Sequence, residues 1–160
     1  MKTLLTIIAS MVIFFQSSTL ETLRNLYPTA GASKANSAKF AVAAEKAGSS
    51  DATVKVYKSA AKIIQAKFET GPDRKSLISD GIKGVESAIA ANPANIEMRL
   101  IRLSIQENLP KVVGYNSKMA EDKNVILRNY SKQNSALKSY IREFAAVSKT
   151  IKPTEKATLK

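Results

Sequence analysis

Polar side chains that could bind an anion recur along one stripe of the chain. Arg99, Arg102 and Gln106 are spaced i, i+3 and i+7, which places them on one face of a helix. Arginines one turn apart can bind a carboxylate or a phosphate through paired hydrogen bonds. A proline turn follows, and it could bring Tyr115 back over this arginine stripe, with Asn108 at the break. The sequence therefore predicts a binding site at these five residues.

A structural role for the same residues is the alternative. Arginines beside a helix break often donate hydrogen bonds to the carbonyl groups of the break, and Asn108 before Leu109-Pro110 is an ordinary helix-end residue. Reversing the charge at Arg102 would distinguish the two interpretations. Loss of the fold would indicate a structural role, whereas loss of binding by a folded protein would indicate a site.

Catalytic chemistry has few candidates in this chain. It contains no histidine and no cysteine, which removes the Ser-His and Cys-His nucleophile pairs, the thiolate metal sites and the usual zinc sites. The neighbouring acids Glu121 and Asp122 would point in different directions on a helix, and near a helix start they simply favour its dipole. We therefore expect no enzymatic activity, no metal and no cofactor.

The net charge of +12 is concentrated in the C-terminal third, where residues 111–160 hold eleven basic and four acidic residues. A second basic surface is expected where Lys55, Lys58 and Lys62 line one face of a helix. In an exported protein such faces favour anionic lipid headgroups or acidic envelope polymers as partners. Simple solubility is the alternative. Nucleic acid is not expected, because aromatic residues for base stacking are not interleaved with the basic ones.

Helical periodicity runs through the chain from Ser33 onward and predicts an all-α fold. We expect about six amphipathic helices, connected by short loops in an antiparallel array. The expected ranges are 34–47, 51–68, 73–91, 93–107, 117–132 and 135–148.

The N-terminal residues have the layout of a secretory signal. Lys2 precedes an uncharged apolar run, 4–15, that is too short to span a bilayer. We expect a signal at 1–19, cut between Ser17 and Leu20, followed by a linker at 20–33. The helical domain would cover 34–150, and a flexible basic tail 151–160. This layout predicts a periplasmic or secreted protein.

Two resemblances bear on the architecture. The junction around Asn92-Pro93 resembles the boundary between tetratricopeptide repeats, although no second copy occurs. The stretch from Asn92 to Asp122, with its Arg–Gln–Asn–Pro–Gly–Tyr string, is similar to a family of small uncharacterised helical proteins that carry signals and come from Gram-negative envelopes. This resemblance implies export and a helical fold, and it supplies no activity.

Together these features predict an exported, non-enzymatic helical module that binds another envelope component, with an envelope protein as the possible partner. The alternative is a peripheral protein that binds anionic membrane or acidic polymer through its basic face.

Overall fold

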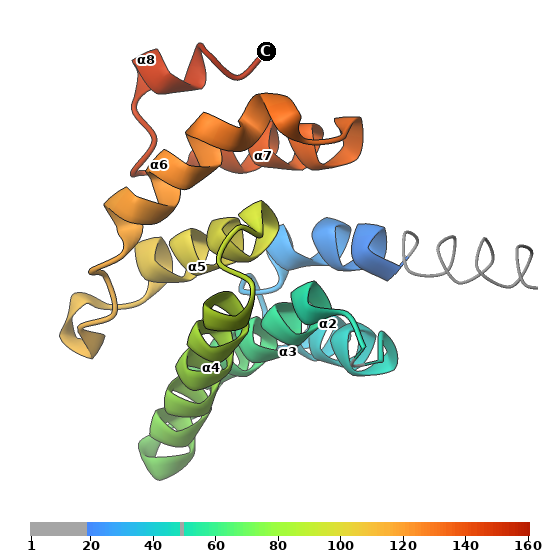
Figure 1. Cartoon of the computed structure of the whole chain (residues 1–160). Coiled ribbons are helices and arrows are strands. Elements are labelled where there is room, and N and C mark those ends of the chain that lie inside the picture. The colour runs from blue at the N-terminus through green and yellow to red at the C-terminus, as the bar shows by residue number, and fades with distance from the viewer. Residues whose placement is uncertain (1–18, 49) are drawn as a thin grey trace, which may run out of the picture. The chain divides into compact units, whose positions relative to one another are not determined.

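The computed structural model describes residues 19–48 and 50–160, and these residues contain helices and no β-strand. The all-α fold expected from the sequence is therefore confirmed for them. Residues 19–26 are helical and lead into the 3-10 turn η1. The α-helices that follow are α2 (Lys34–Lys46), α3 (Ala52–Gln65), α4 (Gly71–Ala91), α5 (Ile96–Asn108), α6 (Met119–Asn129), α7 (Ser135–Val147) and the single turn α8 (Pro153–Lys156) (Figure 1). The 3-10 turns are η1 (Tyr27–Thr29), η2 (Ala66–Phe68), η3 (Lys111–Val113) and η4 (Tyr130–Lys132).

Side-chain caps fix where several of these helices begin. The side chains of Ser33, Asp51, Asn95 and Asn134 each accept a hydrogen bond from a backbone N–H in the first turn of the helix that follows. Pro93 was expected in the first turn of the fourth helix. It lies instead in the turn before the helix, because Asn95 supplies the cap.

The chain divides into two compact units, with the boundary between Gly81 and Ile82 inside α4. The helical domain expected at 34–150 extends over both units. We call the part up to Gly81 the N-terminal unit and the part from Ile82 the C-terminal unit. The expected count of about six helices leaves out residues 19–26 and α8.

The core of the N-terminal unit is built around packed aromatic rings. Tyr27, Phe40 and Tyr57 pack with ring centroids 5.6–6.2 Å apart, in tilted or edge-to-face arrangements that aromatic pairs favour. Leu23 and Ala30 are fully buried. The linker expected at 20–33 is therefore largely helical and contributes side chains to the core, because its apolar residues are buried on folding.

Glycine permits a close helix contact in the N-terminal unit. A Cβ atom added to Gly81 of α4 would lie 2.4 Å from Cγ1 of Ile63 and 2.8 Å from the carbonyl oxygen of Ser59, both on α3. Only a residue without a side chain fits this approach. The close approach of α4 to α3 therefore depends on Gly81.

In the C-terminal unit α5 packs chiefly against α6, and the apolar core continues through α7 to the end of the chain. Ile151 and Leu159 are 2 % and 7 % exposed, and both belong to this core. The hydroxyl of Tyr130 donates a hydrogen bond to the backbone carbonyl of Lys160, at 3.0 Å. The segment expected to be a flexible tail is thus packed against the unit.

The expected signal at 1–19 lies, apart from Thr19, outside the described residues. Within the described part of the chain, no helix is both long enough and apolar enough to cross a membrane.

Candidate functional site

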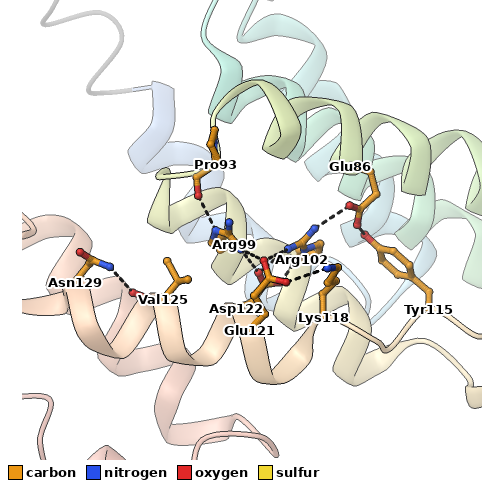
Figure 2. Close-up of polar contacts among 10 residues, drawn as sticks. All are labelled: Glu86, Pro93, Arg99, Arg102, Tyr115, Lys118, Glu121, Asp122, Val125 and Asn129. Atoms are coloured by element: carbon orange, nitrogen blue, oxygen red, sulfur yellow. Dashed lines mark hydrogen bonds and ion pairs between the residues drawn. The ribbon is translucent and has the colours of Figure 1, made fainter.

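The arginine stripe lies at the contact between α5 and α6. Arg99 and Arg102 are one turn apart on α5, and Asp122 faces them from the first turn of α6 (Figure 2). Asp122 Oδ1 accepts hydrogen bonds from Arg99 Nη1 at 2.9 Å and from Arg102 Nη2 at 2.7 Å. Its Oδ2 accepts a second bond from Arg102 Nε at 2.7 Å. Arg102 therefore binds this carboxylate in the bidentate geometry expected of an arginine.

Further partners surround the two guanidinium groups. Arg99 donates through Nε to the carbonyl oxygen of Pro93 at 2.8 Å and through Nη1 to Glu121 Oε1 at 2.8 Å. Arg102 Nη1 donates to Glu86 Oε2, also at 2.8 Å. We call this set the arginine network; it comprises Glu86, Arg99, Arg102, Tyr115, Glu121 and Asp122.

Tyr115 closes one side of the arginine network. Its hydroxyl donates a hydrogen bond to Glu86, the carboxylate that also accepts from Arg102. Gly114, in the left-handed conformation with φ of 71°, precedes Tyr115 in the loop between η3 and α6. Burial and the adjacent Glu86 carboxylate raise the pKa of Tyr115 above its ordinary value. The phenol therefore stays protonated at neutral pH and acts as a hydrogen-bond donor.

Burial and pairing determine the charges in the arginine network. Asp122 is fully buried, and Arg99 and Arg102 are 8 % and 3 % exposed. Burial opposes the charge of Arg102, but the hydrogen bond and charge of Asp122 outweigh it and raise the pKa of the guanidinium. Hydrogen bonds from Arg99 and then Lys118 lower the pKa of the half-exposed Glu121 to about 2. Arg102 and Glu121 are therefore charged at neutral pH.

Of the five residues predicted to form a binding site, three are linked through shared carboxylates, namely Arg99, Arg102 and Tyr115. Asp122 links the two arginines, and Glu86 links Arg102 to Tyr115. Gln106, the third residue of the arginine stripe, is buried near Tyr115 and opposes the rise in the pKa of Tyr115. Neither atom of its amide group has a partner in good hydrogen-bond geometry. Asn108 is not part of the network. It is exposed and donates to the carbonyl of Ser104 at 2.8 Å, as a helix-end residue does.

This geometry favours the structural interpretation of the two arginines. Their donors are directed to groups of the protein itself, and both oxygens of Asp122 accept from them. Sequence reasoning missed Glu86 altogether and gave Asp122 only a role at the helix start. No local pattern in the sequence links these acids to the arginines, because Glu86 lies 16 residues before Arg102 and Asp122 lies 20 residues after it.

The second predicted basic surface is partly engaged. Lys55 and Lys62 are exposed on α3, whereas Lys58 forms an ion pair with Glu45 of α2 at 3.2 Å. In the described part of the chain, no cluster of acidic residues could hold a metal ion.

Comparison with protein-family models, with curated proteins and with solved structures finds no significant match for this chain.

Proposed function

We propose that this protein is an exported, non-enzymatic helical binding module that attaches to an anionic envelope component through exposed lysines of its C-terminal unit. The partner presents repeated phosphate or carboxylate groups, as an anionic membrane surface or an acidic polymer does. The observation that carries the proposal is that carboxylates of this unit form hydrogen bonds and ion pairs with groups of the protein itself.

Acidic side chains of the C-terminal unit are taken up by internal partners. Glu86, Glu121 and Asp122 belong to the arginine network. Glu107 accepts hydrogen bonds from the Ser148 hydroxyl and the Thr150 backbone N–H, and Glu155 accepts from Lys123 Nζ at 2.8 Å. These carboxylates are therefore poorly placed to compensate cations elsewhere on the surface.

Several exposed lysines of the same unit have no ion pair within the described residues. Lys111, Lys132 and Lys152 are exposed, and none of them has an ion pair within the described residues. Each basic residue near an anionic surface contributes about 1 kcal/mol to binding. The arginine stripe is a weaker candidate for the contact because its guanidinium groups already have partners.

The helix pairing supports an interaction module rather than a catalytic scaffold. Consecutive helices pack as pairs within each unit, α2 with α3 and α5 with α6. We propose that these hairpins belong to an antiparallel array resembling tetratricopeptide repeats, which bind partners on exposed helix faces. An envelope protein held on such a face is the second candidate function.

Co-sedimentation of the full chain tests the charge-driven function. We expect binding to phosphatidylcholine vesicles that contain phosphatidylglycerol, or to polyglutamate, and loss of binding at about 0.5 M salt, where screening acts within a few ångströms. Changing Lys111, Lys132 and Lys152 together to glutamine should weaken binding by about 100-fold. Lys58→Gln is the matched control, because that lysine is already paired. Binding that is insensitive to salt, or absent with both probes, would contradict the proposal.

Export is tested separately by N-terminal sequencing of the secreted protein. We expect the chain to begin between Ser17 and Leu20. Recovery of an intact Met1 from the envelope fraction would contradict cleavage.

A further inference from the structure

A pocket of about 440 Å³ lies in the N-terminal unit, and its lining includes none of the three lysines of the proposed function. Three elements line it: the first turn of α2, the end of α3 with η2, and the first turns of α4. Its volume falls within the range of small-molecule sites, about 300–1,000 Å³. Phe68 and Leu77 provide apolar wall, and both are partly exposed. The pocket therefore offers room and apolar surface for a small ligand.

An unpartnered hydroxyl lies in the wall of this pocket. Ser37 is 2 % exposed, and its Oγ has no hydrogen-bond partner. Buried side-chain polar atoms are nearly always paired, so an unpaired one calls for an explanation. A ligand group that hydrogen-bonds the hydroxyl provides one.

Charged side chains of both signs lie around the same pocket. Lys34 Nζ is 3.6 Å from Glu69 Oε1, and both side chains are well exposed, so this ion pair is loose. Asp73 is exposed and has no ion pair within the described residues. The pocket thus presents one ammonium and two carboxylates to a ligand.

Helix ends add to the electrostatics around these charged side chains. Lys34 is the first residue of α2, where the helix end is positive. Glu69 follows η2, which continues α3, and the C-terminal end of a helix is negative. A carboxylate is therefore favoured near Lys34 and an ammonium group near Glu69. Asp73 lies in the first turn of α4, a positive helix end, so there only its own carboxylate attracts an ammonium group.

We propose that this pocket binds a small zwitterion with an apolar side chain, either a free amino acid or a short peptide. Its carboxylate contacts Lys34 and accepts a hydrogen bond from the Ser37 hydroxyl. Its ammonium group contacts Glu69 and Asp73, and its side chain packs on Phe68 and Leu77. A free amino acid and a short peptide carry the same two charged groups and differ in length.

Titration of the isotope-labelled full chain, followed by backbone amide NMR, tests the proposal. The probes are L-leucine and the dipeptide Leu-Leu. We expect saturable shifts at Ser37, Phe68 and Leu77 with at least one of them, and the stronger binder identifies the source. N-acetyl-leucine, which lacks the cation, and leucinamide, which lacks the carboxylate, should each bind about tenfold more weakly than leucine.

Matched variants on α4 locate the site. Asp73→Asn should weaken binding of the better probe by about tenfold, whereas Asp80→Asn, on the same helix but outside the pocket lining, should leave it unchanged. Ser37→Ala should weaken binding without altering the helical circular dichroism spectrum. The absence of saturable shifts with both probes at about 10 mM, or equal binding of leucine and N-acetyl-leucine, would overturn the proposal.

Discussion

Asp122 pairs with two arginines while having no exposed surface of its own. A buried carboxylate is tolerated only when its partners replace the water that it has lost. Here Arg99 and Arg102 donate three hydrogen bonds to it, so charge and hydrogen-bonding capacity are satisfied together. Removing the carboxylate would leave two near-buried guanidinium groups without their main partner.

Asp122→Asn should therefore lower the free energy of unfolding by about 3–5 kcal/mol, as breaking a buried ion pair does. Urea unfolding followed by circular dichroism measures the change. Glu121→Gln is the control, because that carboxylate is half exposed and its loss should cost about 1 kcal/mol or less. A loss below about 1 kcal/mol for Asp122→Asn would mean that the arginine network does not support the fold.

The sequence could identify the arginines but not their partners. Arg99 and Arg102 stand out because helical spacing is a local property. Asp122 lies 20 residues beyond Arg102, on another helix, and Glu86 lies 16 residues before it. Pairings across that separation depend on how helices pack, which a single sequence does not reveal.

At the scale of elements, the contact between α3 and α4 depends on one missing side chain. Gly81→Ala would gain about 1 kcal/mol of helix propensity on α4. The added Cβ would also press against the Ser59 carbonyl, a backbone atom that cannot move aside cheaply. Strain of this kind costs about 1–3 kcal/mol.

We therefore expect Gly81→Ala to lower the thermal midpoint of unfolding, measured by differential scanning calorimetry. Gly31→Ala is the matched control, because no atom lies within 4 Å of the added Cβ and its φ is not positive. A stabilised Gly81→Ala protein would show that α3 and α4 separate easily.

Helix boundaries were predictable where a cap and a glycine or proline mark them in the sequence. The ranges expected for α2, α4 and α7 agree with the structure to within two residues. Residues 151–160 were misread because lysines and a proline dominate their composition. Only two apolar residues there, Ile151 and Leu159, are buried, and their partners are distant in sequence.

At the scale of the whole molecule, the chain carries a net charge of +12, and several acids of its C-terminal unit form internal ion pairs. The pKa of Glu121 falls from 4.5 to about 2 on folding, and a hydrogen bond from Lys123 lowers the pKa of Glu155 as well. Above pH 4.5 the glutamates are ionised in both states, so their stabilising contribution is fully present. Between pH 4.5 and 2 the unfolded chain takes up protons that the folded chain does not, so stability falls as the pH falls.

Urea unfolding between pH 7 and pH 2.5 should thus show a free energy of unfolding that is nearly flat at the upper end and drops below about pH 4.5. The growing net positive charge adds repulsion in the same direction. Glu121→Gln should make the drop shallower, since the variant has no carboxyl to protonate. If the free energy of unfolding fell equally in the variant and the parent protein, groups other than Glu121 would cause the loss of stability in acid.

The Glu107 contact and the arginine network also differ in the entropic cost of closing the chain between the residues that they join. Arg102 and Asp122 are 20 residues apart, whereas the Glu107–Ser148 hydrogen bond joins residues 41 apart. Each doubling of a closed loop adds about 0.6 kcal/mol of entropic cost. From the unfolded chain, the α5–α6 hairpin is therefore the cheaper of the two loops to close, and its ion pairs can form before the C-terminal segment has docked.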